Sequence, residues 1–476
     1  MNHFCGSIEK DAPMLRKHSG VDQCFDMKER YLMIGGRKAY FCYAGSYAND
    51  TLIERLVKCY ITAEIRKGDD AVSFATRCSS FGFFKYQSKV EDCVNEIFDG
   101  AAALIVDGFT CSITSDAKNI PARSIGEPES DRVLRGSRDG FTEKLIDNTC
   151  LIRMRLKTPS LRMKLYPVGD TARCSVVLCY VEGRADGAFV EKLTEKIRSI
   201  RTDALSMSQE SLAECLVKRK WYNPFPKFRY TERPDAACAM MLEGSIIVLC
   251  DNSPQAMILP CSIFDFLQET DDYYFPPLTG SYLRLVRMCV FLLSLFLMPV
   301  WFLLIRNPAL LPDSLSFIMP SAEPAFPIFW QIMLVEFTID GLKLASMNTP
   351  GSLNNSLSVV AGLIIGDFAI EVGWLIPEVI LYMSFVAMAN FTQPSFELGY
   401  AFKFMRIFLL VMISLLNYAG LALGILGIIL FITLNNSVSG ARSYLYPLIP
   451  FNSKALKRLF FRVRLGESRR NTKKSR

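Results

Sequence analysis

The stretch "RVLRGSRDGFTEKL" has residue types suited to gripping an anion. Arg132, Arg135 and Arg138 recur at every third position beside Gly136 and Gly140. Guanidinium groups bind phosphate through paired hydrogen bonds, and glycine lets a backbone approach an anion closely. However, no aromatic residues are interleaved with the arginines, as single-stranded nucleic acid would favour, and acidic residues precede them closely enough to pair with them. We therefore favour a structural or docking role over ligand binding.

A second set of ionisable residues lies within or beside apolar segments of the C-terminal half: Glu336, Asp340, Lys343, Asp367, Glu371 and Arg406. The four carboxylates form two pairs spaced four residues apart, which places each pair on one helix face. Such groups are costly in hydrocarbon unless they pair or meet water. Two interpretations follow. The ionisable residues line an aqueous ion path, or they form structural ion pairs. In the second case Glu336 or Asp340 pairs with Lys343, and Asp367 or Glu371 pairs with Arg406.

The composition excludes several kinds of catalytic site. The two histidines, His3 and His18, both lie in the polar N-terminal stretch, so a histidine-activated nucleophile would have to recruit that stretch. Neither G-x-x-x-x-G-K-[ST] nor G-x-G-x-x-G follows a predicted strand. The 15 cysteines form no C-x-x-C pair, which predicts buried thiols. We expect no enzyme activity, no cofactor and no bound metal.

Apolar periodicity predicts an α/β cytosolic region of two subdomains followed by an α-helical polytopic membrane domain. Strands are expected at "GRKAYFCYAG", "AAALIVDGFTCSIT", "RMKLYPV" and "CSVVLCYVEG", with a strand meander from Cys238 to Pro260 and helices between them. The expected divisions are a polar leader at 1–24, a first subdomain at 25–121, a second subdomain at 122–280, the membrane domain at 281–440 and a basic tail at 441–476.

The membrane domain is predicted from long apolar runs, of which Met288 to Ile305 is 18 residues without a charge. The leader lacks an export signal and the tail is strongly basic, so both ends are expected in the cytosol and the number of crossings is even. Four crossings result if Phe326 to Ala345 does not cross and Ile407 to Leu434 is one tilted helix. Six result if the former crosses and the latter is a hairpin. We favour four.

Two small-xxx-small patterns within the apolar runs predict close helix packing, within one chain or between copies. The glycines concerned are Gly362, Gly366, Gly420 and Gly424.

Longer motifs resemble the bacterial spore germination receptor A-subunit family. They are "EPESDRVLRGSRDGFTEKLIDNTCLIRMRLK", "TERPD" and "DDYY", followed by "VEFTIDGLKLAS", "GLIIGDFAIEVG" and "YLYPLIPF". "IGGRKA", "PEVILY", "PSFEL" and "IPFNSKAL" are most similar to its stage V sporulation protein AF branch. The chain departs from the family pattern at Ser137, Met154 and Lys343.

The resemblance implies a membrane protein of spore germination, similar to an oligomeric ion channel subunit of the spore inner membrane that releases monovalent cations. It implies a homo-oligomer with other germination membrane and lipoprotein subunits as partners, and no nucleic acid. The motif residues with an implied structural or inter-subunit role are Glu127, Arg132, Arg135, Gly136, Arg138, Gly140, Glu232, Arg233, Pro234 and Asp235. The alternatives are a ligand-sensing receptor subunit without its own pore, and a membrane-anchored phosphate-binding protein.

Overall fold

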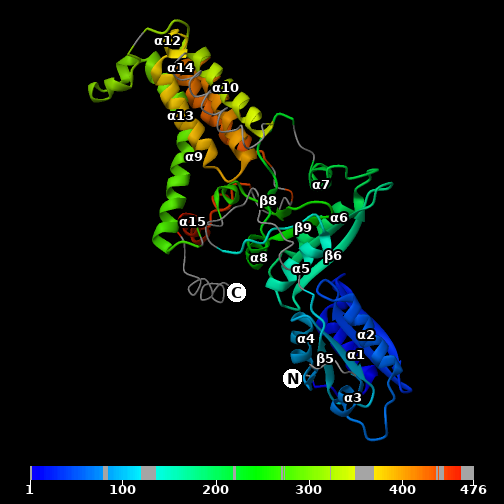
Figure 1. Cartoon of the computed structure of the whole chain (residues 1–476). Coiled ribbons are helices and arrows are strands. Elements are labelled where there is room, and N and C mark those ends of the chain that lie inside the picture. Colours follow the sequence, from blue (N-terminus) through cyan, green and yellow to red (C-terminus); the bar gives the residue numbers. More distant parts are fainter. Residues whose placement is uncertain are drawn as a thin grey trace. The chain divides into compact units, whose positions relative to one another are not determined.

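The structure is a computed structural model that describes residues 3–78, 84–119, 136–217, 221–269, 272, 274–321, 323–348, 369–435, 438 and 444–461. The chain divides into two compact units (Figure 1). Unit 1 comprises Met1–Arg219 and Phe228–Cys261, and unit 2 comprises Lys220–Lys227 and Ser262–Arg476.

The first subdomain of unit 1 is an antiparallel sheet of order β1-β2-β4-β5-β3 between two layers of helices. Its strands are β1 (Met27–Ile34), β2 (Arg37–Ala44), β3 (Phe84–Gln87), β4 (Ala101–Val106) and β5 (Ser112–Asp116). Alternate side chains of β2 and β4 enter opposite cores, because successive residues of a strand point to opposite faces. Helices α1 (Ile8–Ser19) and α4 (Val90–Phe98) cover one face, and α2 (Asp50–Thr62) and α3 (Ala71–Cys78) cover the other.

The N-terminal residues are part of this subdomain, so the prediction of a separate polar leader at 1–24 is wrong. Ile8, Ala12 and Leu15 recur at helical spacing and are buried against the sheet. The buried Asp11 carboxylate accepts hydrogen bonds from the backbone N–H groups of Cys5 at 3.0 Å and Gly6 at 2.9 Å. The polar residues that suggested a leader form the exposed face of an amphipathic helix.

The second subdomain repeats the plan with an antiparallel sheet of order β6-β7-β9-β10-β8. Its strands are β6 (Leu161–Val168), β7 (Cys174–Val181), β8 (Arg229–Thr231), β9 (Ile246–Cys250) and β10 (Ala256–Leu259), and its helices are α5 (Leu145–Arg155), α6 (Gly187–Ser199), α7 (Ser208–Leu216) and α8 (Pro234–Leu242). The predicted strands at β6 and β7 are confirmed. The predicted meander from Cys238 to Pro260 is wrong at its start, because Cys238 to Leu242 belong to helix α8. Pro234 lies in the first turn of this helix, where proline is favoured.

Unit 2 is helical. Its elements are η2 (Ile263–Leu267), α9 (Pro277–Arg306), η4 (Pro308–Leu310), η5 (Asp313–Ile318), α10 (Ile328–Asn348), α12 (Ala369–Glu371), α13 (Pro377–Phe391), α14 (Phe396–Thr433) and α15 (Ser453–Phe460). Helix α9 packs against α13 and α14, and α10 packs against α13. By length and composition, α9 and α14 are the two described helices that are apolar enough to cross a membrane.

Helix α14 folds back on itself, so the interpretation of Ile407 to Leu434 as one tilted helix is wrong. Asn417 has the non-helical angles φ 53° and ψ −122°. The rings of Phe408 and Phe431 lie 6.3 Å apart, although 23 helical residues would separate them by about 35 Å. The arm after Asn417 spans 16 residues to Thr433 and rises about 24 Å. The hairpin removes the basis on which four crossings were favoured.

Candidate functional site

A charged cluster joins three helices inside unit 2. Glu336 on α10 accepts a hydrogen bond from Arg406 Nε on α14 at 2.6 Å, and Arg406 Nη1 donates to the carbonyl of Ser294 on α9 at 2.7 Å. Lys403, one turn before Arg406, forms an ion pair with Asp340 and lies 3.4 Å from Glu336 Oε2. Two carboxylates thus meet two cations, and the cluster has no net charge.

The cluster corrects the ion pairs expected from the sequence. Arg406 pairs with Glu336. Of its two expected partners, Glu371 makes no ion pair with it, and Asp367 lies outside the residues that the structure describes. Lys343 forms no ion pair with Glu336 or Asp340. Its ammonium lies 5.1 Å from the ring centroid of Phe391 and 5.4 Å from that of Tyr400. Cation–π contact with two rings replaces the expected ion pair.

Lys403 of this cluster was not identified from the sequence. It lies three residues before Arg406 in an apolar segment, and this spacing places both cations on one helix face.

The second predicted carboxylate pair is described only in part. Asp367 lies outside the residues that the structure describes, as do Gly362 and Gly366. Glu371 ends α12 and is exposed, with Ile370 38%, Val372 67% and Trp374 60% exposed beside it. Within the described part of the chain Glu371 makes no ion pair. This carboxylate therefore differs from Glu336, which is buried and paired.

The glycines of α14 hold the two arms of the hairpin together. A Cβ atom at Gly420 would overlap the carbonyl oxygen of Met412, and one at Gly424 would lie 2.6 Å from Leu409 Cδ2. Because glycine has no side chain, it lets helix backbones approach closely. The contact predicted for Gly420 and Gly424 is thus made within the chain, and these residues are not left free to join two copies.

A second ion network of unit 2 lies where α9 begins, and it contains the described part of the "DDYY" motif. Asp272 is buried and accepts from Arg284 Nε at 3.2 Å and from Arg287 Nη1 at 3.0 Å. Arg287 also pairs with Glu269 at 2.6 Å. The motif thus fixes the first turns of α9.

The arginine stretch that could bind phosphate is only partly described, since Glu127, Arg132 and Arg135 lie outside the described ranges. Gly136 has a positive φ of 119°, Arg138 is exposed and Gly140 is buried. The structural or inter-subunit role expected for these arginines stays a prediction, and phosphate binding stays the alternative to it.

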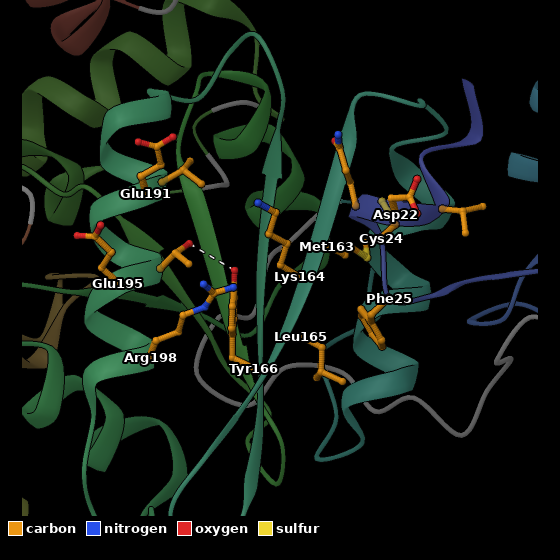
Figure 2. A pocket seen from close by; sticks show the side chains of 14 residues that line it. Asp22, Cys24, Phe25, Met163, Lys164, Leu165, Tyr166, Glu191, Glu195 and Arg198 are labelled. Atoms are coloured by element: carbon orange, nitrogen blue, oxygen red, sulfur yellow. Dashed lines mark hydrogen bonds between the residues drawn. The ribbon is translucent and has the colours of Figure 1, made fainter. Parts of the chain in front are cut away.

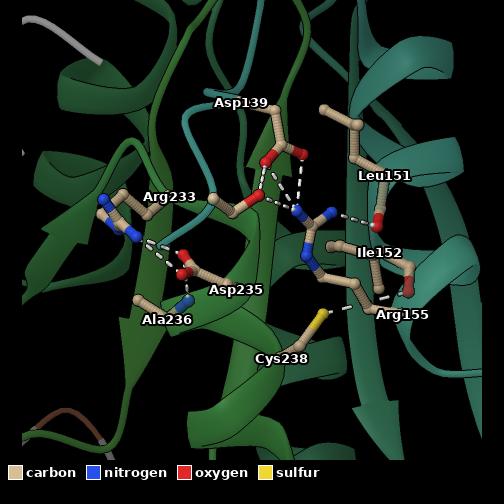
Figure 3. A network of polar contacts seen from close by, with 9 residues as sticks. Asp139, Leu151, Ile152, Arg155, Arg233, Asp235, Ala236 and Cys238 are labelled. Carbon is tan, nitrogen blue, oxygen red and sulfur yellow. Dashed lines mark hydrogen bonds and ion pairs between the residues drawn. The ribbon is translucent and has the colours of Figure 1, made fainter. Parts of the chain in front are cut away.

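The residues that follow Gly136 form a structural contact in unit 1 (Figure 3). Asp139 accepts from Arg155 Nη2 at 2.6 Å and from the Ser137 hydroxyl, and Arg155 also donates to the carbonyl of Leu151 at 3.1 Å. Burial opposes ionisation of Asp139, but the hydrogen bonds from Arg155 and Ser137 outweigh it and lower the pKa of this carboxyl. The network ties the family motif to α5.

The "TERPD" motif forms the neighbouring contact. Arg233, 1% exposed, pairs with Asp235 at 2.6 Å, and Pro234 occupies the first turn of α8 (Figure 3). The carbonyl of Glu232 accepts from the N–H of Phe141 at 2.7 Å, and its carboxylate accepts from Gln255 Nε2 at 3.1 Å. The two motifs, about 90 residues apart in the sequence, therefore meet in the second subdomain as structural elements.

The two subdomains of unit 1 are joined by a buried salt bridge that the sequence analysis did not identify. Arg153 Nε and Nη2 donate to the two oxygens of Asp26 at 3.0 and 2.8 Å, and both side chains are at most 1% exposed. The guanidinium also lies 5.2 Å from the ring centroid of Phe98. Asp26 precedes β1 of the first subdomain, whereas Arg153 lies on α5 of the second.

A cavity of about 630 Å³ opens beside the same junction (Figure 2). It lies between the segment around η1 (Val21–Gln23) and the β6 and α6 elements of the second subdomain. Its charged lining residues are Asp22, Lys164, Glu191, Glu195 and Arg198. The Arg198 guanidinium lies 5.5 Å from the Tyr166 ring, and the Tyr166 hydroxyl lies 3.4 Å from that of Thr194. Both signs of charge line this cavity.

Comparisons with known proteins place these observations in a family. The sequence model described as Bacillus/Clostridium GerA spore germination protein covers residues 15–474. Stage V sporulation protein AF of Bacillus subtilis (strain 168) is 34% identical over 95% of this chain and 92% of its own length. Spore germination protein KA of the same organism is 26% identical over 96% of this chain and 84% of its own.

Among solved structures, the N-terminal domain of the A subunit of the Bacillus megaterium spore germinant receptor GerK3 aligns with a TM-score of 0.42. Its sequence is 21% identical, and the alignment covers 54% of this chain and 96% of that one.

Proposed function

Because the chain belongs to the GerA spore germination family, we propose that it acts in germination as a membrane subunit of an oligomer that conducts monovalent cations. In this proposal unit 2 is embedded in the inner membrane of the spore, and unit 1 and the basic tail lie in the cytosol. Its partners are further copies of itself and other germination membrane and lipoprotein subunits. The chain has no catalytic role in this proposal.

The observation that carries the proposal is the exposure of Glu371. In a single chain within a bilayer, this carboxylate would stand among the exposed apolar side chains of Val372 and Trp374. An ionised carboxylate in hydrocarbon is costly unless it pairs or meets water. Assembly around an aqueous axis supplies the water, and repetition of the residue around the axis makes a charged ring that favours cations.

The paired cluster has a different role in this proposal. Glu336 and Asp340 are neutralised by Lys403 and Arg406, so they are poorly suited to attracting a permeating ion. Their cluster instead holds α10 and α14 against α9, which fixes the helices that frame the path. The four carboxylates predicted to line the pore thus fall into two pairs in this proposal. Glu336 and Asp340 are structural, and Glu371 is the described member of the pair that faces the path.

The test is ion flux through the full chain reconstituted in lipid vesicles. Glu371→Gln keeps the shape of the side chain and removes its charge, so we expect a lower preference for cations over anions with unaltered assembly. Glu323→Gln, at another exposed position outside the helices, is the matched control and should conduct as the wild type does. Equal selectivity in correctly assembled Glu371→Gln and wild-type protein would contradict the role of Glu371. Absence of flux from assembled wild-type oligomers would contradict conduction itself.

The cavity beside the junction of the two subdomains favours a second candidate function, the sensing of a small polar molecule. Glu195 and Arg198 on α6 present opposite charges to the same cavity, which suits a zwitterionic ligand (Figure 2). Thermal stabilisation of the full chain by a panel of zwitterionic small molecules, lost in Arg198→Gln, would support this function. A panel that leaves the melting temperature of the wild type unchanged would contradict it.

A further inference from the structure

A small hollow opens between α10, α13 and α14 of unit 2 (Figure 1). Its volume is about 10 Å³, which is close to the space that one water molecule or one phosphate oxygen needs. The residues that line it are Lys343, Asn390, Phe396, Gly399, Tyr400 and Lys403. No atom lies within 4 Å of a Cβ added to Gly399, so the missing side chain leaves this face of α14 open.

Lys343 is a half-buried cation of this hollow that has no oxygen acceptor among the described residues. Its ammonium lies against the rings of Phe391 and Tyr400. Contact with aromatic rings offsets part of the cost of the charge, but leaves its three N–H donors without an oxygen. Lys403 differs, because it donates to the carbonyl of Glu336 at 3.1 Å and lies 3.4 Å from its carboxylate. The hollow therefore presents one ammonium that can bind an acceptor from outside the chain.

Charge and hydrogen bonding at the hollow both favour an anion. The charged cluster beside it contains two carboxylates and two cations, so Lys343 leaves three cations against two carboxylates. The side-chain Oδ1 of Asn390 is buried and has no hydrogen-bond partner among the described residues. An amide can present its NH₂ group in the same place by turning about its last bond. An excess cation and an amide donor are together suited to one oxygen of a phosphate group.

The position of the hollow along the bundle follows from two contacts between α9 and α14. The ring centroids of Phe291 on α9 and Phe402 on α14 lie 4.0 Å apart. Further along both helices, Arg306 Nη1 donates to the carbonyl of Ile413 at 2.7 Å. The chain advances along both helices between these two contacts, so α9 and the first arm of α14 run in the same direction.

The hollow therefore lies at the level of the charged start of α9. Gly399 precedes Phe402 by three residues, and Arg287 precedes Phe291 by four. These intervals correspond to about 4.5 and 6 Å of helix. Because the uncharged run of α9 begins just after Arg287, this level corresponds to the lipid headgroups of a bilayer that holds α9.

Exposed aromatic rings lie beside the hollow. Phe391 is 67% exposed and Phe396 is 70% exposed. Aromatic residues are enriched at the boundary between hydrocarbon and headgroups, and basic pockets between membrane helices bind anionic headgroups. A lipid would offer a phosphate oxygen to Lys343 and apolar chains to the two rings.

We propose that this hollow binds a phosphate group, with Lys343 and Asn390 donating hydrogen bonds to one of its oxygens. The phosphate belongs to an anionic lipid headgroup or to inorganic phosphate in solution. The lipid source rests on the membrane insertion of unit 2 given under the proposed function, but ion conduction is not required. The competing partner of Lys343 is a carboxylate of a second copy of the chain, and the exposed rings beside the hollow favour a lipid over it.

The experiment titrates the full chain, solubilised in detergent without phosphate, and follows its thermal stabilisation. The probes are phosphatidylglycerol, a diacylglycerol with the same acyl chains but no phosphate, and inorganic phosphate. We expect phosphatidylglycerol to bind several-fold more tightly than the diacylglycerol. Stabilisation by inorganic phosphate as well would assign the site to any phosphate, whereas its absence would assign the site to the lipid. Equal affinity for the two lipids, without an effect of inorganic phosphate, would overturn the proposal.

Substitutions at the hollow provide the second arm. Lys343→Gln should weaken the binding of phosphatidylglycerol about fivefold, the usual contribution of one cation near an anionic lipid surface. Lys343→Arg keeps the charge and should retain the binding. Asn390→Asp keeps the shape of the side chain and gives Lys343 a carboxylate inside the protein, so it should also weaken the binding. Lys67→Gln removes an exposed lysine of unit 1 and is the matched control, which should bind as the wild type does.

The outcomes separate this site from its alternatives. Wild-type affinity for phosphatidylglycerol in Asn390→Asp would overturn the proposal, and this variant decides the question if Lys343→Gln does not fold. Dissociation of the oligomer in Lys343→Gln with unaltered lipid binding would overturn it in favour of a carboxylate from a second copy. Retention of the wild-type chain in vesicles washed with alkaline carbonate measures membrane insertion separately. Its loss from the vesicles would contradict the proposed function and the lipid source.

Discussion

The two units hold their parts together with buried charges arranged in different ways. In unit 1 one arginine, Arg153, meets one carboxylate, Asp26, through two hydrogen bonds. In unit 2 Glu336 is shared by Arg406 and Lys403, and each cation has a further acceptor in the Ser294 carbonyl or in Asp340. Among the described residues the first arrangement has one cation, with the Ser46 hydroxyl as a weaker further donor to Asp26 at 3.3 Å, whereas the second has two cations.

This difference predicts how each unit responds to the loss of one charge. Removal of one partner from a buried ion pair is costly mainly because the other charge stays buried without compensation. A shared cluster can redistribute its remaining hydrogen bonds. We therefore expect the single pair to be the more sensitive site, although both arrangements are buried and neutral.

The largest effect is expected for Arg153→Met. The variant leaves the Asp26 carboxylate buried without its cation and should lower the free energy of unfolding of unit 1 by about 3–5 kcal/mol. Denaturant unfolding of the full chain, followed by hydrogen exchange in β1 and β6, measures it. The double variant with Asp26→Asn should recover part of the loss. A loss below about 1 kcal/mol, the size of an exposed salt bridge, would show that this pair does not join the subdomains.

A smaller effect is expected for Glu336→Gln. Arg406 keeps the Ser294 carbonyl and Lys403 keeps Asp340, so the cost should be about 1–3 kcal/mol. The temperature at which detergent-solubilised protein loses its monodisperse form reports the change, with Glu323→Gln as the control. If Glu336→Gln destabilised the protein as much as Arg153→Met, the shared cluster would tolerate the loss of one charge no better than the single pair does. That result would contradict the difference between the two units.

The hairpin of α14 tests unit 2 without altering any charge. Gly420→Ala places a methyl group against the Met412 carbonyl of the other arm and should cost about 1–3 kcal/mol. Gly399 lies in the first arm with no atom within 4 Å of the added Cβ, so Gly399→Ala should stabilise the helix by up to about 1 kcal/mol. The same thermal assay compares them. Equal effects of the two substitutions would contradict the hairpin.

The smallest effect concerns the pH dependence of Asp139 in unit 1. Its pKa is lower in the folded protein than in the unfolded chain, where it is about 3.9. Its contribution to stability is therefore present above that unfolded value and is lost as the pH falls through the folded pKa. The stability difference between wild type and Asp139→Asn should be largest near neutral pH and shrink in acid. Denaturation midpoints of both proteins, measured near neutral pH and in acid, test this. A stability difference that does not change with pH would exclude the ionised pair with Arg155.

Local sequence patterns predicted much of unit 1, because alternation and helical spacing are local properties. The strands at "RMKLYPV" and "CSVVLCYVEG" followed from them. Helix α1 was missed, because its many polar residues obscured the spacing of Ile8, Ala12 and Leu15. The Arg153–Asp26 pair joins residues 127 apart in the sequence, and no local pattern specifies such a partner.

Unit 2 shows a similar limit. The sequence identified Glu336, Asp340 and Arg406 as ionisable residues in apolar surroundings, but several cations were available and the choice among them depends on helix packing. The fold of α14 had one local signal, Asn417 inside a long apolar run. Asparagine adopts positive φ more readily than most residues. Length alone could not distinguish a tilted helix from two arms.

The placement of α1 has a consequence for synthesis on the ribosome. The helix buries Leu15 in a core that includes Ile97 of α4 and Ile105 of β4, and Ile105 follows Ser19 by 86 residues. At roughly 5–20 residues per second, synthesis of that interval lasts on the order of 5–20 s. During this time α1 has no core to join, so its apolar face is available to chaperones until the middle strands of the sheet emerge.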